Sequence, residues 1–195
     1  MEIYLNRLKA AIEKMSDIPG KEWAYFSEQL HERTYNKGKI LIQEEEHVEN
    51  FFFIVKGLVR SFCLTPEGKE FNKSFAREDE FVGSIVSKVL KEPSRHSSQA
   101  LEKTTVLVLP LRLLEENLYR SPVWERIARK QAERVAIKKD LRESELLTDS
   151  AEKRYRRFLE EFPELVNRIP LYHIASYLGI TDVALSRIRK KIQIS

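Results

Sequence analysis

The chain has 195 residues, of which 42% are hydrophobic and 33% charged, as is typical of a globular protein that can bury a core. No run of about 18 apolar residues occurs, and the first 15 residues carry charges throughout, so we expect a cytoplasmic protein without a membrane span or secretory signal. Residues 1–150 hold 25 basic and 25 acidic residues, whereas residues 151–195 hold 9 basic and 5 acidic ones. The net charge of +4 therefore lies in the C-terminal end, which indicates either a polyanionic partner or a solvated basic surface.

The first part of the chain changes from a helical pattern to a strand pattern. Apolar residues recur at helical spacing in residues 3–30, and Pro19-Gly20 interrupts them. Segments rich in β-branched and aromatic residues follow, separated by Gly and Pro turn signals, at residues 39–42, 51–55, 58–62 and 105–109. Short strands at this close spacing predict a sandwich or a barrel-like roll.

Residues 122–147 are predicted to form one long helix. Pro122 suits a first-turn position, and no Gly or Pro follows before Pro163. An apolar stripe runs among its many charges: Val123, Trp124, Ile127, Ala128, Ala132, Val135, Ala136, Leu141 and Leu146. A stripe of this length favours a dimer seam, although packing on the roll alone would produce the same pattern.

Residues 148–195 are predicted to be helical again, and residues 170–191 have the layout of a helix-turn-helix. Pro170 can begin a helix, Gly179 can adopt the left-handed conformation that ends it, and Thr181 can cap a second helix. Leu185 and Ile188 are expected to face inward. The second helix of such a unit fits the major groove of DNA. We therefore predict that the DNA-contacting residues are Thr181, Asp182, Val183, Ser186, Arg187, Lys190 and Lys191.

The segment Leu178-Gly179-Ile180-Thr181, followed by Leu185-Ser186-Arg187-Ile188-Arg189-Lys190, resembles the Crp/Fnr family of bacterial transcription regulators. The stretches Phe53-Ile54-Val55-Lys56-Gly57-Leu58-Val59, Pro66-Glu67-Gly68-Lys69-Glu70 and Glu80-Phe81-Val82-Gly83 are similar to that family's cyclic nucleotide-binding roll. The resemblance covers roughly residues 25–191 in the right order. It implies an α+β protein with an antiparallel β-roll sensor domain and flanking helices (1–120), a dimerisation helix (121–147) and a helix-turn-helix DNA-binding domain (148–195).

The resemblance also implies partners and roles. A homodimer would read a two-fold operator in double-stranded DNA, and an activator would also contact RNA polymerase. Arg187 matches a DNA-contacting arginine of the family, so we expect it to read a guanine edge. Val183 is suited to a thymine methyl group. Lys190 and Lys191 are assigned either to phosphates or to a solvated helix end.

The effector site departs from the family's cyclic AMP-binding members. Those members hold the ribose with a glutamate, where Ser84 follows Gly83 here, and they present two hydroxyl residues to adenine, where Lys139 and Asp140 stand here. An unknown small-molecule effector other than cyclic AMP is therefore expected. Its candidate residues are Gly83, Ser84, Arg95, His96 and Ser97, and Arg95 is equally consistent with an exposed loop residue.

The predicted helix-turn-helix departs from the family as well, because Asp182 and Val183 replace an Arg–Glu pair. The resemblance therefore supports DNA binding more strongly than it supports any particular target sequence. The chain ends soon after the second helix, and the usual β-hairpin wing is expected to be short or missing.

The sequence argues against two other classes of protein. A cupin-like metalloenzyme would need clustered His and carboxylate ligands, whereas the four histidines are scattered and Cys63 is the only cysteine, so we predict no enzyme activity, catalytic residue, metal or cofactor. The single Cys63 also argues against an iron–sulfur sensor, and its strand-like surroundings indicate an inert thiol. The second alternative is a signalling module that binds a nucleotide or a protein but not DNA, and the basic excess of residues 151–195 argues against it.

Overall fold

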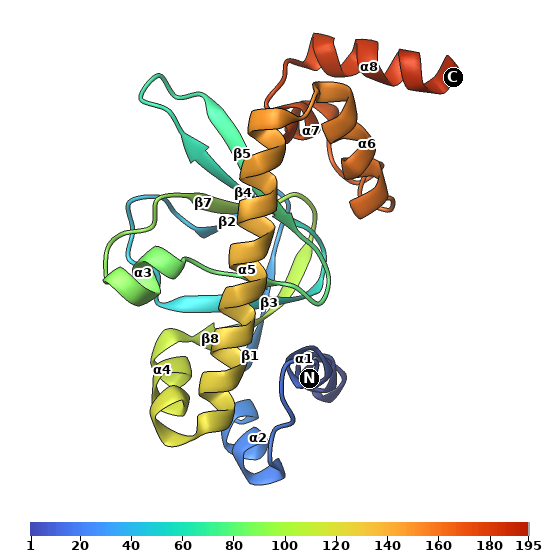
Figure 1. Cartoon of the computed structure of the whole chain (residues 1–195). Coiled ribbons are helices and arrows are strands. Elements are labelled where there is room, and N and C mark those ends of the chain that lie inside the picture. The colour runs from blue at the N-terminus through green and yellow to red at the C-terminus, as the bar shows by residue number, and fades with distance from the viewer. Residues whose placement is uncertain (195) are drawn as a thin grey trace.

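The computed structural model describes residues 1–194, with side chains up to Ile192, and its centre is a roll of two four-stranded antiparallel sheets (Figure 1). One sheet has the order β1-β8-β3-β6 and the other β2-β7-β4-β5. The strands are β1 (His31–Tyr35), β2 (Ile40–Ile42), β3 (Asn50–Lys56), β4 (Val59–Leu64), β5 (Glu70–Ala76), β6 (Phe81–Val82), β7 (Ser97–Ala100) and β8 (Thr104–Pro110). The predicted α+β class with an antiparallel roll is confirmed.

The apolar run in β3 is explained by burial on both faces of the strand. Phe52 and Ile54 point into the core between the two sheets. Phe53 and Val55 point the other way, into a core formed with α1 (Glu2–Glu13), α2 (Gly20–Ser27) and the helices after the roll. Side chains alternate between the two faces along a strand, so a strand that is covered on both faces carries apolar residues on both. Pro19-Gly20, read as an interruption, is the start of α2, with Pro19 at its N-cap.

The helices that follow the roll are α4 (Leu111–Arg120) and the 27-residue α5 (Pro122–Thr148), and the short α3 (Ile85–Leu90) connects β6 to β7. The long helix is confirmed, with Pro122 in its first turn. Trp124 and Ile127 are buried against the N-terminal helices, whereas residues 131–148 carry no fully buried side chain. In Figure 1, α5 runs along the roll from α4 to the C-terminal helices.

The C-terminal helices are α6 (Ala151–Glu161), α7 (Leu171–Leu178) and α8 (Asp182–Ile194), and they share one apolar core with the roll. We call these helices and their connections, residues 150–194, the head. Leu58, Phe75 and Leu101 of the roll lie in the same buried cluster as Phe158 and Tyr177 of the head. The rings of Phe75 and Tyr177 have their centroids 5.3 Å apart. The head is therefore packed on the roll.

Ion pairs border this junction. The guanidinium of Arg168, in the connection between α6 and α7, lies 2.9 Å from a carboxylate oxygen of Glu78 and 2.7 Å from one of Glu102. Glu78 also accepts a hydrogen bond of 2.8 Å from the backbone N–H of Gly57. Hydrogen bonds from Arg168 hold the pKa of Glu78 below its usual range despite partial burial, which raises it. Arg168 thus joins the head to two loops of the roll.

Two histidines are buried in this structure. Burial, reinforced by the positive charges of Lys73 and Lys139, lowers the pKa of His96 to about 4. Burial and the adjacent Arg60 lower the pKa of His173 to about 4, against an opposing effect of Glu70. In both cases the neutral imidazole is the form that the fold accommodates.

These two histidines make folding stability sensitive to acid. Because each folded-state pKa lies below the unfolded value of about 6.5, the unfolded chain binds more protons between pH 6.5 and 4. The free energy of unfolding should therefore decrease as the pH is lowered from 6.5 to 4, by on the order of 1 kcal/mol per pH unit for each histidine. Urea unfolding at several pH values should give a flatter dependence for His96→Gln and for His173→Gln than for the wild type. His31→Gln, at an exposed position on β1, is the matched control, and equal slopes in all four proteins would contradict the prediction.

Candidate nucleic-acid interface

The turn between α7 and α8 has the conformation that a helix-turn-helix needs. Gly179 has a φ of +68°, in the left-handed region, and the N–H of Ile180 donates to the carbonyl of Ala175 at 3.0 Å. The hydroxyl of Thr181 accepts from the N–H of Ala184 at 3.2 Å, which caps the first turn of α8. The left-handed glycine and the threonine cap are both confirmed.

Two arginines from other helices bind the end of α7. Arg142 of α5 donates to the carbonyl of Tyr177 and stacks over its ring, 4.0 Å from the centroid. Arg154 of α6 donates to the carbonyl of Leu178 at 3.0 Å. These carbonyls have no partner within the helix, and they lie at its negative end, so cations are favoured there. The turn is therefore fixed from α5 and from α6.

The orientation of α8 agrees with the predicted pattern. Leu185 is fully buried, and Ile188 packs partly against the same core. The outward face exposes every residue predicted to contact DNA: Thr181, Asp182, Val183, Ser186, Arg187, Lys190 and Lys191. Val183 is 61% exposed. The structure thus brings the seven residues together along one surface.

The basic residues on that surface differ in their surroundings. Lys191 lies 2.7 Å from a carboxylate oxygen of Glu152 in α6, so its charge is already matched within the head. Arg187 and Lys190 form no ion pair with any side chain in the described part of the chain. An exposed cation without a protein partner is available to a phosphate or a base edge.

The second half of α5 is a separate exposed surface. Ile137 and Leu147 are 61% and 79% exposed, and Ala132, Ala136 and Leu141 are exposed as well. Trp124 and Ile127, from the same predicted stripe, are instead buried in the roll's own core. The stripe therefore divides into a part that the chain covers itself and a part that it leaves open.

The five candidate effector residues have partners within the protein. Gly83 lies against the ring of Phe51, with no room for a Cβ atom. The hydroxyl of Ser84 accepts from the N–H of Ser87 at the start of α3, and the hydroxyl of Ser97 accepts from the N–H of Glu44 at 3.0 Å. His96 is buried, and Arg95 is exposed and paired with Glu92.

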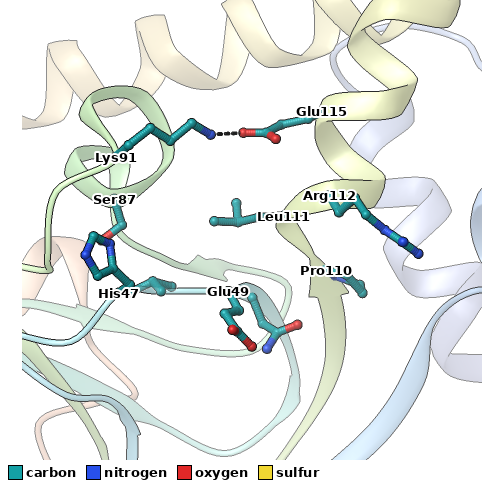
Figure 2. A pocket seen from close by; sticks show the side chains of 10 residues that line it. His47, Glu49, Ser87, Lys91, Pro110, Leu111, Arg112 and Glu115 are labelled. Atoms are coloured by element: carbon teal, nitrogen blue, oxygen red, sulfur yellow. Dashed lines mark hydrogen bonds and ion pairs between the residues drawn. The ribbon is translucent and has the colours of Figure 1, made fainter.

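Two pockets lie elsewhere, and none of those five residues lines either of them. The larger, of about 440 Å³, lies between the β2–β3 loop, α3 and the β8–α4 junction (Figure 2). An ion pair between Lys91 and Glu115 spans one side. His47 lies beside Ser87, whose buried hydroxyl has no hydrogen-bond partner among the described residues. Sequence reasoning missed this pocket because its residues come from three separate segments without a shared motif.

Comparisons with known proteins agree with this architecture. Residues 32–120 match the family model of the cyclic nucleotide-binding domain. FixK2 from Bradyrhizobium japonicum is 22% identical, with a TM-score of 0.72 and 85% of each chain covered. CLP from Xanthomonas campestris, described as a c-di-GMP-responsive global regulator, is 14% identical, with a TM-score of 0.71 over 90% of this chain and 92% of that one. A protein described as a Crp/Fnr-family transcriptional regulator from Eubacterium rectale is 17% identical, with a TM-score of 0.70 over 91% and 84%.

A search of the curated proteins finds no match. Among residues 1–194, no helix is long and apolar enough to span a bilayer, and no three His, Cys, Asp or Glu side chains gather as a metal site requires. The chain therefore has the fold of the solved Crp/Fnr-type regulators, with a cyclic nucleotide-binding domain match over residues 32–120 of its roll.

Proposed function

We propose that the chain is a sequence-specific, DNA-binding transcription regulator of the Crp/Fnr type that acts as a homodimer in the cytoplasm. The observation that carries the proposal is the outward face of α8, beside a capped helix start. There Arg187 and Lys190 are exposed and form no ion pair with the described residues. A helix of this kind inserts its N-terminal side chains into the major groove, and its later basic residues neutralise phosphates. For an activator, RNA polymerase is the further partner.

Different contacts are proposed for Arg187 and Lys190. Arg187 lies nearer the start of α8, where a bidentate contact with a guanine edge is reachable, with Val183 available to a thymine methyl group. Lys190 lies one turn later and is assigned to a phosphate. Lys191 would have to leave Glu152 to make a second phosphate contact.

The test compares two variants on two DNA duplexes at several salt concentrations. One duplex is enriched by the wild-type protein from a random-sequence pool, and the other has the same composition in scrambled order. Arg187→Ala should cost roughly 1–3 kcal/mol of binding free energy on the enriched duplex and relax the preference at one base pair. Lys190→Ala should weaken both duplexes alike and lower the salt slope by about 1. Wild-type affinity of Arg187→Ala for the enriched duplex would count against the docking of α8.

A two-fold operator calls for a two-fold protein, and the exposed second half of α5 is the proposed seam. Ala136 is exposed on the single chain, so a charge there would cost little unless a partner helix covers it. The neighbouring Val135 is half-buried already, which makes Ala136 the sharper position to test.

Ala136→Glu should therefore shift the protein from dimer to monomer, because the carboxylate would be buried between two copies of α5. Sedimentation velocity at micromolar concentration measures the shift. Lys37→Glu, which introduces the same carboxylate in the exposed turn between β1 and β2, is the control and should stay dimeric. A wild-type protein that sediments as a monomer would exclude the seam.

The proposed effector of the roll is a small molecule other than cyclic AMP. Ser84, Arg95 and Ser97 are engaged with protein partners, and the charged Lys139 and Asp140 stand where the family's hydroxyl residues meet adenine.

Calorimetric titration with cyclic AMP should therefore give no binding at micromolar concentration, because the ribose and adenine partners are absent. A cyclic AMP-binding regulator titrated in parallel is the positive control. A dissociation constant in the micromolar range or tighter would overturn this part of the proposal.

A further inference from the structure

We infer that Arg60, on the sensor roll, is a positioning residue for DNA recognition: it fixes the head on the roll so that α8 is held in its reading orientation. The inference rests on the proposed DNA-binding function and concerns a residue outside the DNA interface. Arg60 lies in β4, in an otherwise apolar and small-residue strand, and only 3% of it is exposed. A buried guanidinium is costly unless it is fully hydrogen-bonded, so its partners are informative.

The partners of Arg60 come from three elements. Its Nε donates to Gln99 of β7 at 2.9 Å, and its Nη1 donates to Asn72 of β5 at 3.1 Å. The same Nη1 lies 2.5 Å from a carboxylate oxygen of Glu70 and 3.4 Å from Nδ1 of His173 in α7. The guanidinium therefore connects two strands of the roll to the first helix of the helix-turn-helix.

Asn72 extends this connection to the head. Its side-chain amide donates to the carbonyl of His173 at 3.0 Å and approaches Nδ1 of the same ring at 3.1 Å. Its backbone N–H donates to the hydroxyl of Ser176 at 2.9 Å, and that hydroxyl donates in turn to the carbonyl of Glu70. Asn72 and His173 are 7% and 5% exposed, so these bonds form in a dry junction where an unpaired group would be costly.

The arrangement fixes the state of His173. Arg60 and Asn72 both point donors at Nδ1, so this nitrogen must be the acceptor and the ring must be neutral. The hydrogen bonds of this network therefore form only when α7 packs against β4 and β5 in one defined geometry. Since α7 is joined to α8 through the Gly179 turn and the shared core around Leu185, fixing α7 also fixes α8.

We take the docked head to be the reading state, because the face of α8 proposed to contact DNA is exposed. Every outward residue of α8 from Asp182 to Arg187 is exposed while the network is formed. A dimer that reads two half-sites needs its two heads at a fixed separation. Releasing Arg60 should therefore harm the recognition of a specific sequence and leave salt-dependent binding to any duplex unchanged.

The decisive variants are Arg60→Gln and the control Arg33→Gln. Arg33 is also on the roll and lies over the ring of Tyr35, but it is exposed, and no hydrogen bond or ion pair joins it to the described residues of the head. On the duplex enriched by the wild-type protein, Arg60→Gln should lose affinity by at least about fivefold, while its affinity for the scrambled duplex stays at the wild-type value. Arg33→Gln should match the wild type on both.

A second set of variants acts from the head, in case Arg60→Gln folds poorly. His173→Leu removes the acceptor and should reproduce the loss on the enriched duplex. His173→Asn places a side-chain oxygen near the position of Nδ1 and should restore most of the affinity. The double variant Arg60→Gln/His173→Leu should bind the enriched duplex no more weakly than either single variant, because both substitutions break the same network.

Hydrogen exchange of the unbound protein separates this inference from the function on which it rests. Arg60→Gln should speed amide exchange in α7 and β5 and leave α1 and α2 unchanged, whether or not any duplex binds. Unchanged exchange in α7, equal losses on both duplexes, or tighter binding by Arg60→Gln would each overturn the positioning role. A wild-type protein that binds no duplex, yet shows the faster exchange on substitution, would instead refute the DNA-binding function.

Discussion

The burial of one apolar surface between the roll and the head is the constraint on which the rest of this structure depends. Leu58, Phe75 and Leu101 would be exposed on an isolated roll, and Phe158 and Tyr177 would be exposed on an isolated head. Burying one such side chain contributes roughly 1.5–3 kcal/mol, so this contact is a large part of the stability of a small protein. It also creates the dry environment in which Arg60, Asn72 and His173 must satisfy one another.

The long helix α5 connects three parts of the molecule. Its first turns pack Trp124 and Ile127 among the N-terminal helices, and its middle brings Lys139 close enough to lower the pKa of His96. Its last turns place Arg142 on the end of α7. A shift of this helix relative to the roll would therefore act both on the candidate effector residues and on the turn that carries α8. This is a physical route between the two, and a demonstrated second state of the helix would be needed to call it allosteric.

The sequence predicted those features that depend on local chemistry. Helical periodicity predicted α5, the apolar runs predicted β3 and β8, and the Gly179-Ile180-Thr181 spacing predicted the turn and its cap. Besides β5 and β6, the prediction missed β1, which has a single buried residue, and β7, whose Ser97 and Ser98 are buried as hydroxyls and not as apolar side chains. Neither β1 nor β7 has the alternation by which strands are found.

The junction could not be predicted, because its members are brought together by tertiary packing. Arg60 and His173 are 113 positions apart, and each has an ordinary local interpretation as a surface residue. One signal was present: an arginine inside the strand 58–62, which otherwise reads as buried, requires buried partners. The partners of His173 lie on the roll, far from it in the sequence.

The shared core also bears on how this protein could have diversified. Helix-turn-helix heads are often thought of as modules that recombine freely with different sensors. A head moved to another protein would carry Phe158 and Tyr177 without the surface that covers them here. A roll joined to another head would leave Phe75 exposed to solvent. Roll and head are therefore expected to change together. Under the proposed function, a new operator preference would then arise by substitutions on the outward face of α8 and not by exchange of the whole head.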